Sequence, residues 1–296
     1  MRDAFSQYHP TVNFLWFTMV ILFTMFFMHP MCLLISLVCS VSYTIYLHRG
    51  KASGFLIKYL ILLTLITALL NPVFNHQGAT IVGYLWTGNP LTLESILYGG
   101  ATAIMLISVI CWFSCFNQVI TSDKIIYIFG QIMPSLSLFL SMALRFVPRF
   151  KHRLIAISLG QKAMGRNISK AKAIQKITSG VKIVSILITG ALEDAIITAD
   201  SMKSRGYGLP GRKAFSIFRF SRGDKAVLLI IGALSLYIIG AAIRGYLAFQ
   251  YFPYLKGMKD DLWLHSVFSA YLLLCLIPLF INLWEDCRWK RIQSEI

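Results

Sequence analysis

Long runs of apolar residues dominate both ends of the 296-residue chain. Because a membrane-spanning helix needs about 20 mostly apolar residues, the pattern predicts an all-α integral membrane protein with about six transmembrane helices. The predicted spans are Val12–Met28, Met31–Leu47, Phe55–Asn71, Leu97–Ile120, Ala226–Phe249 and Leu262–Leu283. A shorter apolar stretch, Ile81–Trp86, is too short to span a membrane, and the sequence leaves open whether it forms a partial or re-entrant piece.

The middle of the chain has a different pattern, in which apolar residues recur every three or four positions. In Gly180–Gly206 this stripe predicts an amphipathic helix. Met133–Phe150 is apolar enough to touch the membrane, whereas Phe150–Arg166 and Lys170–Ser179 are predicted as shorter, more basic helices. We expect these helices to lie under the membrane with their apolar faces toward it. The predicted organisation is thus 1–120 and 225–296 in the membrane, with a cytosolic helical region at 121–224.

Composition and charge agree with this division. Hydrophobic residues make up 57% of the chain and charged residues only 14%, against about 25% in a soluble domain. Ile120–Asp224 holds nine lysines and eight arginines against five acidic residues, so it carries +12 of the net charge of +16. The 72–96 connection has no Lys or Arg. Since basic loops stay in the cytosol, we expect a multi-pass cell-membrane protein with both termini cytosolic.

Acidic residues are absent where two classes of membrane protein need them. No Asp or Glu occurs from Ala4 to Leu93 or from Ser95 to Ser122, which removes the usual proton and cation carriers of a stand-alone permease. No carboxylate cluster suits the Mg²⁺ site of a membrane-embedded transferase. The adjacent pairs Glu193-Asp194, Asp260-Asp261 and Glu285-Asp286 are expected to be solvated charges. A permease or membrane enzyme with a basic cytosolic domain remains the alternative function.

Other candidate chemistry is weak. Gly206–Lys213 imitates a phosphate-binding loop but has Arg212 in the lysine position and follows a predicted helix, so we expect no nucleotide site in this chain. His29 and His76 lack partners at metal-ligand spacing and are better explained as hydrogen-bonded residues near helix ends. The six cysteines have no zinc-like spacing and are expected to pack as small apolar residues. We therefore expect neither a metal nor a cofactor in this chain.

Two arginines stand at predicted ends of cytosolic helices: Arg166 in "QKAMGRN" and Arg205 in "SMKSRGYG". Asn167 and Gly206 follow them, and both residue types tolerate the left-handed backbone that ends a helix. One interpretation is that each arginine complements the helix dipole, which contributes about 0.3–1 kcal/mol. The other is that each guanidinium docks into a groove on a partner protein. The local pattern favours neither.

Several motifs occur in an order that resembles a known family. They are "NPVFNHQGAT", "GNPLTLESILYG" and "TSDKIIYIFGQIMPSLSLFLSMALRFVPRF", followed by "QKAMGRN" and "ADSMKSRGYG". Together they resemble the transmembrane T component of energy-coupling factor (ECF) transporters, the EcfT/CbiQ family. The resemblance covers about Asn71 to Asp224.

The resemblance implies a non-catalytic coupling subunit of an ABC-type importer of a vitamin or other micronutrient. It implies two cytosolic ATPase subunits, which would hold ATP and Mg²⁺, and a membrane-embedded, substrate-binding S component, but no nucleic acid. Arg145 and Pro148 would be structural residues of the coupling region. The residues implied to dock the ATPases are Gly165, Arg166, Asn167, Ser204, Arg205 and Gly206. Those implied to contact the S component are Val184, Leu187, Ile188, Ala191 and Ala195.

Overall fold

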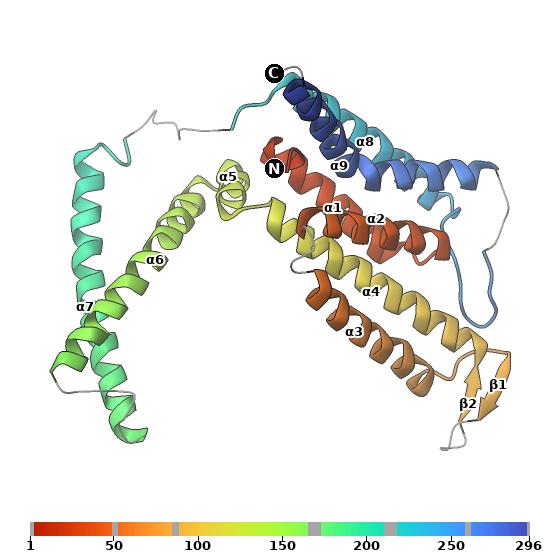
Figure 1. Ribbon diagram of the computed structural model, residues 1–296, viewed down its shortest axis with the longest axis horizontal. Coiled ribbons are helices and arrows are strands. Elements are labelled where there is room, and N and C mark those ends of the chain that lie inside the picture. The colour runs from red at the N-terminus through yellow and green to blue at the C-terminus, as the bar shows by residue number, and fades with distance from the viewer. Residues whose placement is uncertain are drawn as a thin grey trace. The chain divides into compact units, whose positions relative to one another are not determined.

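The computed structural model describes residues 3–48, 53–84, 89–164, 173–209, 218–257 and 262–294, and these are almost entirely helical (Figure 1). A single 3-10 turn, η1 (Phe5–Gln7), precedes the helices. The helices that coincide with predicted spans are α1 (Pro10–Phe26), α2 (Pro30–His48), α3 (Ser53–Phe74), α4 (Leu93–Val119), α8 (Arg222–Ile243) and α9 (Leu262–Ser294). Between them lie α5 (Ser122–Ile132), α6 (Pro134–Ala163) and α7 (Ala173–Ser204). The all-α fold class is confirmed.

Four of these helices, α2, α4, α8 and α9, are long and apolar enough to cross a membrane. Helix α1 and the Leu62–Phe74 part of α3 are shorter apolar helices within the described residues. Helix α8 ends at Ile243, six residues before the predicted end of its span. The reason is Gly245, whose positive φ of 79° turns the chain out of the helix although the following residues are apolar.

Where the sequence leaves a partial or re-entrant membrane piece open at Ile81–Trp86, the described residues form a β-hairpin. Strand β1 (Ile81–Tyr84) pairs antiparallel with β2 (Pro90–Thr92), and residues 85–88 lie outside the described part of the chain. The hairpin leads directly into α4, where the Glu94 carboxylate accepts a hydrogen bond from the Thr80 hydroxyl at 2.7 Å. A β-branched apolar run of this length fits a strand as well as a helix, and pairing with β2 decides the outcome.

Two of the motifs quoted above meet around this hairpin. A Cβ added to Gly78 would lie 2.6 Å from the Glu94 Oε2 atom, and one added to Gly99 would lie 2.9 Å from the Ala68 carbonyl oxygen. The Ser95 hydroxyl also donates to the carbonyl oxygen of Asn75. The glycines therefore allow the 75–80 loop and α3 to approach the start of α4 closely. These motifs have a structural role in holding α3 against α4.

Polar side chains join the membrane helices inside the first compact unit, Met1–Lys124 with Phe218–Ile296. The Trp16 indole donates to the Leu274 carbonyl oxygen at 2.9 Å, and the Trp112 indole donates to the Ser36 hydroxyl at 3.0 Å. The Thr24 hydroxyl lies 2.8 Å from Ser36. Such interhelical bonds contribute about 0.6–2 kcal/mol each in a membrane. The cysteines fill the spaces between them: five of the six are buried and all six are free.

A buried lysine fastens the N-terminal segment to this unit. Lys124 is only 6% exposed, and its ammonium donates to the carbonyl oxygens of Ser6 at 2.6 Å and Val119 at 2.9 Å. Burial lowers the pKa of Lys124, while the nearby charge of Asp3 acts in the opposite direction. The Val119 carbonyl belongs to the last turn of α4, so one lysine satisfies a helix end and holds η1 beside it.

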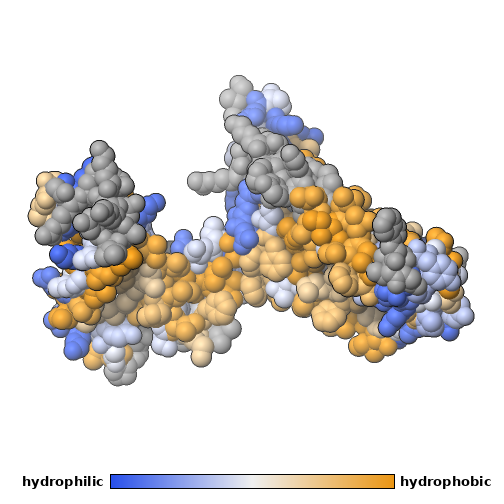
Figure 2. Space-filling view, turned by 90° about the horizontal axis from the view of Figure 1, so that it is seen from below, coloured by the Kyte–Doolittle hydropathy of each residue, from blue (hydrophilic) through white to orange (hydrophobic). Residues whose placement is uncertain are grey.

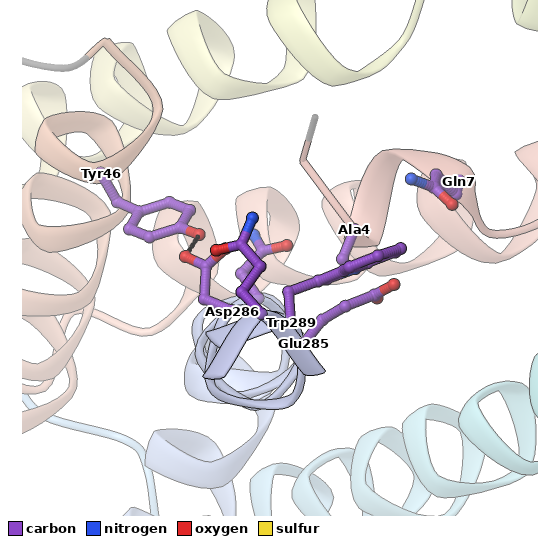
Figure 3. A pocket seen from close by; sticks show the side chains of 8 residues that line it. Ala4, Gln7, Tyr46, Glu285, Asp286 and Trp289 are labelled. Atoms are coloured by element: carbon purple, nitrogen blue, oxygen red, sulfur yellow. Dashed lines mark hydrogen bonds between the residues drawn. The ribbon is translucent and has the colours of Figure 1, made fainter. Parts of the chain in front are cut away.

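Asp286 is likewise not the solvated charge that its sequence context predicts. Its Oδ2 atom accepts a hydrogen bond from the Tyr46 hydroxyl at 2.7 Å, which links α9 to α2. Figure 3 shows Tyr46 and Asp286 pointing toward one another at one side of a pocket of about 310 Å³ that Ala4 and Trp289 also line. A charge near a span end therefore serves interhelical contact here.

Candidate functional site

The second compact unit, Ile125–Ile217, contains the predicted arginine-ended helices. The predicted shorter helices here are wrong: α6 runs unbroken through Pro148, and α7 is one helix of 32 residues, about 48 Å long. Each basic segment extends the more apolar helix next to it, because adding residues to an existing helix is far easier than starting one. Arg166 with Gly165 and Asn167 lies outside the described residues.

The end of α7 has a defined geometry. Gly206 adopts a φ of 75°, its amide donates to the Lys203 carbonyl at 2.9 Å, and the Tyr207 amide donates to the Met202 carbonyl at 3.0 Å. This pair of bonds is the Schellman motif. It places Arg205 at the C-cap, directly after the last helical residue Ser204, with an exposed side chain. The predicted left-handed helix end at Gly206 is confirmed.

The same tripeptide ends α8 in the same way. Gly245 has a φ of 79° and donates to the Ala242 carbonyl at 2.9 Å, while the Tyr246 amide donates to the Ala241 carbonyl at 3.2 Å. Arg244 takes the place of Arg205 and is also exposed. The sequence Arg-Gly-Tyr therefore produces this helix end in both units. Helix-end geometry alone does not distinguish docking from capping, and Arg244 provides a matched comparison for Arg205.

An ion pair that the sequence did not suggest joins α6 to α7. Both guanidinium nitrogens of Arg153 contact the Asp194 carboxylate, at 2.7 Å and 3.3 Å, and one of them also donates to the Gly190 carbonyl at 3.0 Å. Arg149 lies 3.8 Å from the same carboxylate. Asp194 is thus a half-buried partner of two arginines and not a fully solvated charge. The only signal in the sequence is the i, i+4 spacing of Arg149 and Arg153, which places both on one face of α6.

The structure divides the predicted apolar stripe of α7 between two faces. Leu187 and Ala191 are half-buried and share a face with Ile183, Gly190 and Asp194, the face that turns toward α6. Val184, Ile188 and Ala195 are exposed on the neighbouring face. Val181, Leu192 and Ile196, which the prediction omitted, are 61–65% exposed and widen this open face. In Figure 2 this unit shows apolar and hydrophilic side chains next to one another.

The remaining predicted residues have modest surroundings. Arg145 and Pro148 are exposed on α6. His29 accepts a hydrogen bond from the Met31 amide, and His76 lies 3.0 Å from the Asn89 amide nitrogen, so the hydrogen-bonded interpretation of both is confirmed. Within the described residues no three His, Cys, Asp or Glu side chains are grouped to hold a metal ion. The glycine-rich stretch from Gly206 follows helix α7, and 210–217 lie outside the described part of the chain.

Comparison with known proteins identifies the family. Residues 3–217 match the family model CbiQ, described as "Cobalt transport protein". The EcfT protein of Streptococcus thermophilus, an energy-coupling factor transporter transmembrane protein, is 26% identical over 209 residues, which is 66% of this chain and 78% of the relative. The protein of the same name from Listeria innocua is 29% identical over 185 residues, 58% and 69% of the two chains. The chain therefore belongs to the EcfT/CbiQ family, the transmembrane components of energy-coupling factor transporters.

Proposed function

We propose that this chain is the non-catalytic coupling subunit of an ECF-type importer of a vitamin or other micronutrient. The observation that carries the proposal is the match to the EcfT/CbiQ family, and the Schellman end of the 32-residue helix α7, where Arg205 is exposed, is the docking element we assign. In this proposal Ser204, Arg205 and Gly206 enter a groove on one ATPase subunit, and the guanidinium meets a carboxylate there. Gly165, Arg166 and Asn167 would engage the second ATPase.

The α6–α7 pair can act as a lever in this mechanism because it is joined by polar contacts as well as by packing. The Arg153–Asp194 ion pair lies part-way along both helices. A displacement of the α7 end by an ATPase would therefore reach α6 through that link. ATP and Mg²⁺ would be held by the ATPases, with no nucleotide or cofactor bound to this chain.

The exposed apolar face of α7 is the proposed contact for the S component. Val184, Ile188 and Ala195 belong to it, whereas Leu187 and Ala191 would support it from the α6 side. Large apolar side chains that are about half to two-thirds exposed on one helix indicate a surface that another protein or the bilayer covers. The substrate would be held by the S component and not by this chain.

The proposed location is the cell membrane, with both termini and the α6–α7 unit in the cytosol. The support is the distribution of basic residues, which are dense in 121–224 and missing from the 72–96 connection. The hairpin β1–β2 would then face the outside.

The experiment compares Arg205→Ala and Arg205→Lys with Arg244→Ala in the reconstituted complex. Removing a docked guanidinium should cost about 2–5 kcal/mol of ATPase binding, and lysine should not restore it because it lacks the planar fork. Arg244→Ala should leave ATPase pull-down and uptake unchanged, since it alters the same helix-end motif in the other unit. If Arg205→Ala behaves like Arg244→Ala, Arg205 is a helix cap only, whose loss costs less than about 1 kcal/mol.

A further inference from the structure

An open groove between α8 and α9 belongs to the membrane unit and is not used by the proposed coupling mechanism. Its volume is about 830 Å³, within the range of a small-molecule site. The residues that line it are Tyr8, Val227, Leu229, Ile230, Ala233, Leu234, Leu273, Leu276, Ile277, Phe280, Ile281, Trp284, Glu285 and Arg288. Figure 1 shows the two helices running alongside each other.

The chemistry of the groove changes along its length. From Leu273 to Ile281 on α9, and along the facing side of α8, every lining residue is apolar. The polar lining residues lie at the end of the groove formed by the C-terminal part of α9. They are Tyr8, Trp284, Glu285 and Arg288. Trp and Tyr are typical of the membrane–water interface, so this end of the groove is expected to lie at the level of the lipid headgroups.

The polar end carries an excess of positive charge. Arg288 lines it, and Arg291 continues the same face of α9 one turn farther on. On α8, Arg222 and Lys225 precede Leu229 by seven and four residues and so share its side of the helix. All four basic side chains are exposed. The acids nearby are Glu285 and Asp224, and the Asp224 carboxylate already accepts the amides of His9 at 3.0 Å and Ser221 at 2.8 Å.

We propose that this groove binds an anionic phospholipid, with its acyl chains along α8 and α9 and its phosphate at Arg288. An apolar groove with one basic end matches a molecule that has two hydrocarbon chains and one anionic headgroup. Leu229, Phe280 and Trp284 are 67–71% exposed, so the groove is open on the surface that lipid chains contact in a membrane. Basic pockets between transmembrane helices on the cytoplasmic side are a known form of lipid headgroup site. The inference rests on the cytosolic orientation of the α9 end in the proposed function.

The test is native mass spectrometry of the full chain with equimolar phosphatidylglycerol and phosphatidylcholine that carry identical acyl chains. Wild-type protein should retain one phosphatidylglycerol in preference. Arg288→Ala should reduce that retention about fivefold, the ~1 kcal/mol of one basic residue near an anionic surface. The matched control is Arg244→Ala, at the opposite end of α8. Ala233→Trp should fill the groove and abolish retention, whereas Leu236→Trp, 72% exposed outside the lining, should not.

Several results would overturn the proposal. Equal retention of the two lipids, or full retention by Ala233→Trp with a thermal transition like that of the wild type, would show that the groove has no selective site. Displacement of the lipid by excess inorganic phosphate would show that only the anion is recognised. A photo-crosslinker at Phe280 in the whole transporter should label lipid, and a protein adduct there would assign the groove to a partner subunit. ATPase pull-down by Arg288→Ala should remain normal, which separates this proposal from the docking of Arg205.

Discussion

Both terminal nitrogens of the Arg153 guanidinium on α6 donate hydrogen bonds to the Asp194 carboxylate on α7, although the two residues are 41 positions apart in the chain. The shorter contact is 2.7 Å, and the same nitrogen also donates to the carbonyl oxygen of Gly190. The Asp194 side chain is 15% exposed, so water does not fully screen the pair. This contact sets which faces of α6 and α7 meet.

Replacing the carboxylate should loosen the helix pair. We expect Asp194→Asn to cost about 1–2 kcal/mol, between an exposed ion pair and a buried charged hydrogen bond. Hydrogen exchange of α6 and α7 amides measures the loss. Glu193→Gln is the control, because that neighbouring side chain is exposed and forms no ion pair with any residue that the structure describes. Equal exchange in the two variants would contradict a structural role for the pair.

Two glycines of α7 should respond oppositely to alanine. Gly180→Ala should stabilise the helix by about 0.5–1 kcal/mol, since nothing lies within 4 Å of the added Cβ. At Gly190 the Cβ would lie 3.2 Å from the Arg153 Nη1 atom and disturb its contact with Asp194. We therefore expect Gly190→Ala to gain nothing or to lose stability. Thermal unfolding, monitored by size-exclusion chromatography, distinguishes the outcomes. An equal gain in stability for Gly180→Ala and Gly190→Ala would contradict the role of Gly190.

The left-handed residue at the end of α7 should matter for docking as well as for stability. Gly206→Ala and Gly245→Ala each force alanine into positive φ, at a cost of about 1–2 kcal/mol. Both should lower the thermal transition, because both end a helix with the same motif. Only Gly206→Ala should also reduce co-purification of the ATPases. Loss of the ATPases from both variants would point to general unfolding.

Lys124 should be needed to keep the N-terminal segment in place. Lys124→Met keeps most of the side-chain length but leaves the carbonyls of Ser6 and Val119 without their donor. We expect a loss of about 1–3 kcal/mol and faster proteolysis ahead of α1. Lys290→Met serves as the control because Lys290 is exposed on α9. Unchanged proteolysis in Lys124→Met would show that packing alone holds η1.

Membrane orientation can be measured by replacing two exposed alanines with cysteine and labelling them from outside the cell. In a Cys287→Ser background the remaining native cysteines are buried, so an added thiol is the accessible one. Ala79→Cys, beside the hairpin, should react with an impermeant maleimide in intact cells. Ala163→Cys, at the end of α6, should react only after the cells are opened. The reverse pattern would invert the proposed topology.

Local chemistry was enough to determine the positions of the membrane helices and the end of α7. An apolar run of about 20 residues has no stable option in a membrane other than a helix, so all six predicted spans coincide with helices. Glycine after Arg205 was enough to predict the left-handed turn, because it is the residue that enters positive φ without strain. The motif order also pointed to the family that the comparison identifies.

Only the tertiary structure decided how distant segments meet. Ile81–Tyr84 is a strand because β2 pairs with it, and Asp194 is a half-buried ion-pair partner because α6 brings Arg153 to it. The burial of Lys124 likewise depends on Ser6, more than 100 positions away in the chain. The groove depends on residues of two separate helices, α8 and α9. Charge and hydropathy describe each residue by itself. The energy of an ion pair or of strand pairing, and the shape of a groove, depend on how close distant residues lie, and only the fold supplies that distance.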